Sequence, residues 1–250
     1  MTRRRKLAAA AAVSTYLLVG LVAVPAAADD ARAAFALPRV VLNTCPATTA
    51  VVRSRAPGTG KTVALTFDDG PGRSTSSMLT ILQRNGIRAT FFNIGAQLAT
   101  RVSLLQREVR LGAAIGNHTW DHPEMPTLTA TAQAREIDRT TAAIERLAGV
   151  RPCLFRPPYG EYTATTLRLA TARHLGFWTW SVDPEDWKAE GSASTYWVRR
   201  IVSRAKAGLS QLHPVILLHN GTLGNPATVA ALPQIIRAYR SAGYRFVRLH

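Results

Sequence analysis

From Thr62 onward, short apolar runs alternate with longer amphipathic segments, and this alternation constrains the fold more than any other feature of the chain. The apolar runs predict strands, and the segments between them predict helices because their apolar residues recur every three or four positions. The expected strands are 62–67, 88–93, 113–117, 153–156, 177–180, 214–218 and 245–249. The expected helices lie near 75–85, 97–111, 129–148, 162–175, 193–207 and 227–242. Regular β-α alternation predicts a parallel sheet, either open or closed into a barrel.

Chemically reactive side chains follow these apolar runs. Six of them stand at the C-terminal end of an expected strand: Asp68, Asp69, His118, Arg156, Asp183 and His219. In barrel enzymes the active site lies at that end of the strands, because the connecting loops meet there. The sequence therefore predicts that these residues form a single site.

Two histidines and two acids carry the clearest chemical signal. His118 and His122 are four residues apart, so they can face one point from a single helical turn or tight loop. With a carboxylate such as Asp69 they supply the ligands of a catalytic metal that keeps positions open, which leaves Asp68 free to act as a base. Adjacent strand residues point to opposite faces, so both acids reach one site only if the strand breaks at Gly70-Pro71.

Each of these signals is weak alone. An Asp-Asp-Gly-Pro segment is more often an ordinary turn, and a histidine pair at this spacing also arises by chance. Their joint occurrence, at strand ends, predicts a metal-assisted hydrolase.

Three further segments complete an ordered series. The five segments are Thr66-Phe67-Asp68-Asp69-Gly70, His118-Thr119-Trp120-Asp121-His122, Arg156-Pro157-Pro158-Tyr159, Asp183-Pro184-Glu185-Asp186-Trp187 and Leu217-Leu218-His219. In this order and spacing they closely resemble the polysaccharide deacetylases, also called NodB-homology or carbohydrate esterase family 4 enzymes. The resemblance covers roughly residues 61–250. It implies a distorted (β/α) barrel of seven or eight strands, and no residue of the catalytic pattern is missing.

The resemblance also implies a metal-dependent mechanism. Asp69, His118 and His122 would hold one divalent ion, with zinc the first expectation and cobalt or nickel compatible with the same ligands. The ion would polarise the acetyl carbonyl and lower the pKa of bound water. Asp68 would remove the proton of that water, and Arg156 would pair with Asp68 to keep it ionised and oriented.

A second group of residues would complete the reaction. The resemblance makes His219 the acid that protonates the leaving amine, held and tuned by Asp186. The backbone amide of Tyr159 would help to hold the oxyanion. Trp187 and Leu217 would form the walls of a small pocket for the acetyl methyl group, although Trp187 could equally be an ordinary core residue.

The N-terminus is typical of an export signal. Basic residues 3–6 precede an apolar stretch at 7–24, and Ala26-Ala27-Ala28 offers a small-residue cleavage site. The expected divisions are a signal peptide at 1–28, an irregular arm at 29–60 and the deacetylase domain at 61–250. The alternative is a retained signal anchor. No later run is long enough to span a bilayer, so we expect a secreted or wall-associated monomer without a transmembrane anchor.

The balance of charge is strongly basic. The formal net charge is +16, and removing the four basic residues of the signal leaves +12. Export argues against a nucleic-acid partner. Anionic envelope polymers are the expected electrostatic partners, through an attraction that salt would screen. The alternative is that the charge serves only solubility.

The chain has two cysteines, Cys45 and Cys153. An even number of cysteines in an exported protein predicts a disulfide bond, which would tie the arm to the domain near the Arg156 segment.

Four functions are compatible with these residues. The first is an N-deacetylase acting on N-acetylglucosamine-type units of peptidoglycan or chitin. The second is an O-deacetylase such as an acetylxylan esterase, and the third is a non-catalytic wall-binding protein. A glycosidase is the weakest alternative, because Asp68 and Asp69 are adjacent and do not flank a bond from two sides. The acetylated polymer itself is not identified by the sequence.

Overall fold

The computed structural model describes residues 45–250. The expected signal peptide at 1–28, its cleavage site and the first part of the arm lie outside the described residues. Within 45–250, none of the helices combines the length and the apolar character that crossing a membrane requires.

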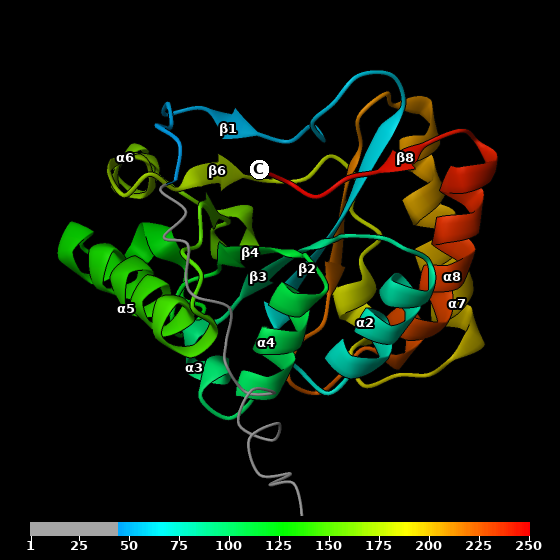
Figure 1. Ribbon diagram of the computed structural model, residues 1–250, viewed down its shortest axis with the longest axis horizontal. Helices are drawn as coiled ribbons and strands as arrows, with labels where there is room; N and C mark the ends of the chain where they lie inside the picture. The colour runs from blue at the N-terminus through cyan, green and yellow to red at the C-terminus, as the bar shows by residue number, and fades with distance from the viewer. Residues whose placement is uncertain (1–44) are drawn as a thin grey trace, which may run out of the picture. The chain divides into compact units, whose positions relative to one another are not determined.

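The described residues form a parallel sheet with helices packed around it (Figure 1). The strands are β1 (Val52–Arg53), β2 (Thr62–Gly70), β3 (Thr90–Asn93), β4 (Ala114–Asn117), β5 (Leu154–Phe155), β6 (Gly176–Trp178), β7 (Val215–His219) and β8 (Arg245–Phe246). Their order is β1-β6-β5-β4-β3-β2-β7, and β8 pairs with the first residues of β2. Each of these pairings is parallel, as the alternation of strands and helices predicts.

The sheet curls into a distorted barrel, which confirms the expected fold. The two ends of the strand order are connected by isolated backbone bridges in the segments that follow β1 and β6, rather than by a regular ladder. Arg55 forms an antiparallel bridge with Pro214, and Val182 forms a parallel bridge with Ile216 of β7. The chain after β6 therefore closes the gap and brings its own loop against the end of β7.

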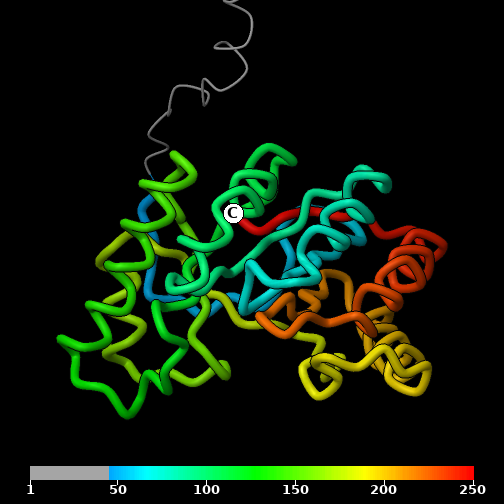
Figure 2. Tube along the Cα trace, turned by 90° about the horizontal axis from the view of Figure 1, so that it is seen from below, coloured from blue at the N-terminus to red at the C-terminus, as the bar shows by residue number. Residues whose placement is uncertain are grey.

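The helices cover the outside of the sheet. They are α2 (Thr75–Arg84), α3 (Gly95–Leu98), α4 (Val102–Arg110), α5 (Ala130–Ala148), α6 (Ala164–Ala172), α7 (Thr195–Ala205) and α8 (Pro226–Ser241). Short 3₁₀ turns occupy Met125–Thr127, Pro158–Gly160, Asp186–Ala189 and Lys206–Ser210. Helices α5 and α6 pack together at one end of the sheet, and α7 and α8 pack together at the other (Figures 1 and 2).

Strand β2 is buried on both faces, and the alternation of its side chains sets the face on which Asp68 lies. Val63, Leu65 and Phe67 belong to the large core cluster that includes residues of α2 and α8. Ala64 belongs instead to the cluster that contains Phe92 and Val215. Since side chains alternate along a strand, Thr66 and Asp68 lie on the same face as Ala64, inside the barrel.

Two elements differ from the sequence-based expectation. Residues 52–53 form strand β1 on the edge of the sheet, although 29–60 was expected to be irregular. A two-residue strand is too short to show periodicity. The single helix expected at 97–111 is two helices, α3 and α4, because Arg101 leaves the helical region at φ −137°. No glycine or proline marks that break in the sequence.

The two cysteines form the expected disulfide bond. Cys45 and Cys153 are joined, across a sequence separation of 108 residues. The bond fastens the first described residue to the segment just before β5, which leads into Arg156.

Removing this bond is expected to destabilise the protein. In the chain-entropy model, a cross-link that closes a loop of about 100 residues stabilises by about 4–5 kcal/mol at most, and measured values are often smaller. The Cys45→Ala/Cys153→Ala variant should therefore unfold at lower temperature and lower urea concentration than the oxidised protein. Reduced wild-type protein is the control and should behave like the variant. Equal unfolding midpoints for variant and oxidised wild type would contradict the expectation.

Candidate active site

A pocket of about 370 Å³, here called the site pocket, opens at the C-terminal ends of the strands. It is lined by Asp68, Asp69, His118, His122, Tyr159, Trp180, Asp183, Trp187, Glu190, Leu217 and His219. Apart from the cysteines, the residues given a role from the sequence line this pocket, with two exceptions. Arg156 and Asp186 are fully buried behind it, in contact with Asp68 and His219.

The end of β2 brings two adjacent acids to the same pocket. Asp68 pairs with Phe92 of β3, but the register then shifts, so that Gly70 rather than Asp69 pairs with Asn93. Asp69 adopts φ +68°, the left-handed region that a non-glycine residue occupies at a cost of about 1–3 kcal/mol. Because of this turn, the Asp69 side chain no longer follows the alternation of side chains between the two faces of the strand. The break that the sequence required therefore occurs at Asp69 itself, one residue before Gly70-Pro71.

Asp69, His118 and His122 converge on one point. Asp69 Oδ1 lies 3.3 Å from His118 Nε2 and 3.1 Å from His122 Nε2. Desolvation raises the pKa of Asp69, but the two imidazoles outweigh it and hold that pKa well below its usual range. Asp69 is therefore a carboxylate.

The ring tautomer of His118 fits a cation at this cluster. Its Nδ1 donates to the carbonyl oxygen of Arg156 at 2.7 Å, so in the neutral ring Nε2 carries only a lone pair. That lone pair faces Asp69 Oδ1, a buried oxygen without a hydrogen-bond donor among residues 45–250. Two facing lone pairs repel unless a positive charge lies between them, and two imidazoles with one carboxylate suit a divalent transition metal.

The loop between the two histidines is held in a strained conformation. Thr119 and His122 have φ values of +67° and +60°. The N-terminus of α3 donates two hydrogen bonds to the loop, from Gly95 to the Thr119 carbonyl and from Ala96 to the Trp120 carbonyl. These contacts fix the direction from which His122 approaches Asp69.

Glu136 of α5 supplies a further anchor that the sequence did not reveal. Its Oε2 accepts hydrogen bonds from the backbone amides of Trp120 at 2.8 Å and Asp121 at 2.9 Å. Both amides lie between the two histidines. Glu136 stands in the middle of an amphipathic helix without any motif around it, so only the tertiary structure links it to the site.

Arg156 is a buried cation that orients Asp68. Its Nη1 donates to Asp68 Oδ1 and to Thr66 Oγ1, each at 2.8 Å, and its Nη2 donates to the Thr179 carbonyl at 2.9 Å. The guanidinium also lies 4.2 Å from the centre of the Phe92 ring. Burial lowers the pKa of Arg156, and the charge of Asp68 opposes this effect. The expected Arg156–Asp68 pair is present.

On the neighbouring strand β7, where His219 is in register with Asp68, the His219 side chain is paired with Asp186. His219 Nδ1 donates to Asp186 Oδ1 at 2.7 Å, and the His219 amide donates to Oδ2 at 2.9 Å. Thr228 of α8 also donates to Oδ2. Burial of the ring opposes protonation, but Asp186, with Asp69 and Asp68 beyond it, raises the pKa of His219 to about 9. His219 thus carries a proton over the neutral range and directs its Nε2 side toward the pocket.

Aromatic residues form the rim of the site pocket. Trp187 is 51% exposed and Tyr159 is 60% exposed, so Trp187 is not a core residue. The Tyr159 ring packs edge-on against His122, with centroids 4.7 Å apart. Leu217, almost fully buried, forms part of the floor. Trp180 also lines the pocket, and its place just after the end of β6 is the sequence signal that marks it as a site residue.

Comparisons with known proteins agree with this geometry. Residues 55–179 match the family model for the polysaccharide deacetylases. A peptidoglycan-N-acetylglucosamine deacetylase of Bacillus cereus is 33% identical over 204 residues, which cover 80% of this chain and 91% of that protein. A bifunctional xylanase/deacetylase of Pseudobutyrivibrio xylanivorans is 39% identical over 188 residues, which cover 75% of this chain. The chain spans only 29% of the length of that bifunctional relative.

A solved structure supports the same relationship. The family 4 carbohydrate esterase from Streptomyces lividans, determined in complex with acetate, is 38% identical and superposes with a TM-score of 0.65. The superposition covers 74% of this chain and 90% of the esterase.

Removing the Glu136 anchor is expected to weaken metal binding. Partners that orient metal ligands typically contribute about 10- to 100-fold in affinity, so Glu136→Ala should raise the zinc dissociation constant by that factor. Glu136→Gln, which keeps an acceptor oxygen, should restore part of the affinity. The measurement is competition with a chromophoric chelator. Glu145→Ala, on the same helix but paired with Arg151, is the matched control. Equal zinc affinities for the two alanine variants would refute the role of Glu136.

Neutralising Asp186 is expected to lower the pKa of His219. The carboxylate stabilises the imidazolium, whereas burial disfavours it, so Asp186→Asn should move this pKa from about 9 to below the ordinary value near 6.5. His219 would then lose its proton at lower pH. NMR titration of the metal-free protein measures this shift. Thr228→Val removes one hydrogen bond but keeps the charge, and should leave the pKa nearly unchanged. An unaltered titration in Asp186→Asn would contradict the assignment.

Proposed function

Since the chain belongs to the polysaccharide deacetylase family, we propose that it is a secreted, metal-dependent carbohydrate N-deacetylase. In this proposal it hydrolyses N-acetyl groups of N-acetylglucosamine-type units in peptidoglycan or chitin and releases acetate. The observation that carries the proposal is the meeting of three functional clusters around one pocket: Asp69–His118–His122, Asp68–Arg156 and His219–Asp186.

Asp69, His118 and His122 would hold the divalent ion, and zinc is our first choice, with cobalt or nickel compatible with the same ligands. An ion bound there polarises the acetyl carbonyl and acidifies water. The hydrogen bond from His118 Nδ1 to the Arg156 carbonyl keeps Nε2 free for the ion. Glu136 keeps His122 within reach of the same point through the loop amides.

Asp68 is proposed as the base that removes a proton from the attacking water. Its Oδ1 is occupied by Arg156 at 2.8 Å, so Oδ2, which lies 3.8 Å from His118 Nε2, faces the pocket. The ion pair fixes the carboxylate in one orientation. A positioned base of this kind typically contributes about 10²–10⁴ to the rate.

His219 is proposed as the acid that protonates the departing amine. An amine is a poor leaving group as an anion, so the nitrogen needs a proton when the carbon–nitrogen bond breaks. The raised pKa keeps His219 protonated near neutrality, and Asp186 fixes the ring through Nδ1 so that Nε2–H can be donated. The proposed acid and base stand on the neighbouring strands β7 and β2, and each is held by its own buried charged partner.

The remaining pocket residues would bind the acetyl group. The backbone N–H of Tyr159 is proposed to donate to the developing oxyanion. Trp187 and Leu217 would enclose the methyl group, because both line the pocket and present apolar surface to it. The exposed side chain of Trp187 also offers a flat face to a sugar ring at the pocket entrance.

The second candidate is an O-deacetylase such as an acetylxylan esterase. The 39% identity to a bifunctional xylanase/deacetylase favours keeping it, since the same acid and base can cleave an ester. A non-catalytic wall-binding protein is the least favoured alternative, because such a protein would not need an intact acid, base and metal cluster. We further propose that the protein acts outside the cell as a monomer, in contact with the envelope.

Acetate release from chitooligosaccharide, peptidoglycan and acetylated xylan, compared in one assay, tests the proposal. We expect release from at least one of the two N-acetylated polymers. Chelation should abolish the release and a divalent cation should restore it. Release from xylan alone would favour the esterase, and no release from any polymer in the presence of metal would reject the enzyme.

Two variants separate the base from the metal ligands. Asp68→Asn should retain zinc but lose about 10²–10⁴ in kcat, because it removes the base alone. His118→Ala should lose both zinc and activity. Zinc content by mass spectrometry and initial rates of acetate release measure the two effects. Loss of zinc from Asp68→Asn to the same extent as from His118→Ala would place Asp68 among the ligands instead.

A further inference from the structure

Helix α7 carries a row of cations on its exposed side. Ile201, Val202 and Ala205 are buried on the inner side. Tyr196, Arg199, Arg200 and Arg204 follow one another at helical spacing on the outer side, where they line a concave surface of about 440 Å³ together with Thr195 and Ser203. This surface is called the arginine hollow.

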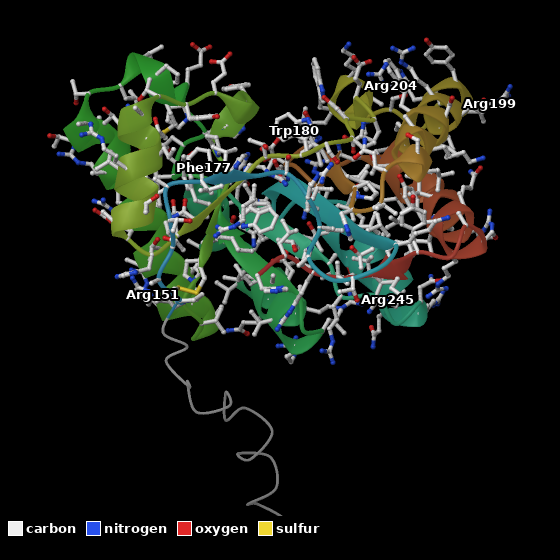
Figure 3. The ribbon with its side chains drawn as sticks, turned by 90° about the horizontal axis from the view of Figure 1, so that it is seen from above. Arg151, Phe177, Trp180, Arg199, Arg204 and Arg245 are labelled. Atoms are coloured by element: carbon white, nitrogen blue, oxygen red, sulfur yellow. A yellow bond between two sulfur atoms is a disulfide. The ribbon has the colours of Figure 1, made fainter. Side chains whose placement is uncertain are left out.

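The arginine hollow adjoins the site pocket. Arg204 Nε donates to the carbonyl oxygen of Asp183 at 3.3 Å, and Asp183 lines the site pocket. Arg204 and Asp183 also line one small depression of about 270 Å³ together. In Figure 3 Arg204 is labelled between Trp180, which belongs to the site pocket, and Arg199. A polymer whose reacting unit lies in the site pocket can therefore continue over Asp183 onto α7.

The charges of the arginine hollow are not balanced within residues 45–250. Glu185 is shared by three cations, with Lys188 at 3.0 Å, Arg200 at 2.9 Å and Arg204 at 3.3 Å. Arg199 is exposed and forms no ion pair with the described part of the chain. The carboxylate of Asp183 is turned to its own loop, where its Oδ1 accepts a hydrogen bond from the backbone amide of Glu185 at 2.7 Å. Of the three arginines of the hollow, Arg200 and Arg204 thus share one carboxylate with Lys188, and Arg199 has no carboxylate partner among residues 45–250.

This arrangement suits an anion on a sugar. Guanidinium groups bind planar carboxylates and phosphates through paired hydrogen bonds, which a lysine cannot form. Tyr196, 61% exposed, adds a flat aromatic surface beside them. A neutral glycan would leave the guanidinium group of Arg199 without a charged partner.

We propose that the arginine hollow binds a carboxylate or phosphate substituent of the same polymer whose acetyl group enters the site pocket. The substrate is then an acidic acetylated glycan rather than a neutral one. The inference rests on the proposed deacetylase function, and it assigns a substrate class to that function.

The test compares two soluble polymers with the same N-acetylglucosamine backbone: neutral glycol chitin and anionic carboxymethyl chitin. Affinity gel electrophoresis measures binding without turnover, and acetate release measures KM. At low ionic strength we expect binding of the anionic polymer to be about 3- to 10-fold tighter. The difference should vanish near 1 M salt, where the Debye length is about 3 Å.

Charge reversal at one unpaired arginine locates the effect. Arg199→Glu should abolish the preference for carboxymethyl chitin and retain the wild-type kcat/KM on glycol chitin. Arg84→Glu is the matched control, because Arg84 is an exposed residue in the last turn of α2. That end of α2 lies away from the site pocket, since the helix runs back from the C-terminal end of β2. Arg84→Glu should keep the preference.

Three outcomes would overturn the inference. The first is equal binding of both polymers by wild type. The second is the same loss of the preference for carboxymethyl chitin in Arg84→Glu as in Arg199→Glu. The third is a loss of kcat/KM on glycol chitin in Arg199→Glu that equals the loss on carboxymethyl chitin. Absence of acetate release from both chitin derivatives and from peptidoglycan would contradict the proposed function instead, and the gel comparison would still decide whether the arginine hollow binds anions.

Discussion

The site depends on a buried cation, Arg156, which is fully enclosed at the end of the barrel. Its guanidinium holds Asp68, and its carbonyl oxygen accepts the Nδ1 proton of His118. One residue therefore sets the orientation of both the proposed base and a candidate metal ligand. Leaving either charge of such a buried pair without its partner typically costs about 3–5 kcal/mol. The pair is thus a structural requirement as well as a functional one.

Strained backbone accompanies the functional residues. Five non-glycine residues of the site loops have left-handed φ values: Asp69, Thr119, His122, Tyr159 and Glu185. Each such conformation is unfavourable in isolation and persists only where surrounding contacts fix it. Glu136 and the amides of α3 provide those contacts for the histidine loop. The scaffold thereby holds imidazole and carboxylate groups in an arrangement that no regular strand or helix would give.

The two charged groups that flank the pocket differ in how they are stabilised. Asp68 is held by one buried guanidinium, whereas His219 is held by one buried carboxylate. Burial of the ring opposes protonation, but that carboxylate raises the pKa of His219. These different partners are the electrostatic basis for assigning the acid role to His219 and the base role to Asp68.

The sequence by itself determined the type of fold and the residues that meet. The alternation of apolar runs specified parallel strands, and the reactive side chains stood at strand ends because a parallel barrel gathers those ends. It did not show strand β1 or the division between α3 and α4, since two-residue strands and a single non-helical residue leave no periodic signal. Only the tertiary structure decided how Asp69 turns beside Asp68, which proton His118 carries, and that Glu136 and the arginines of α7 adjoin the site. Those facts depend on contacts between segments far apart in the chain, and no local pattern of residues encodes them.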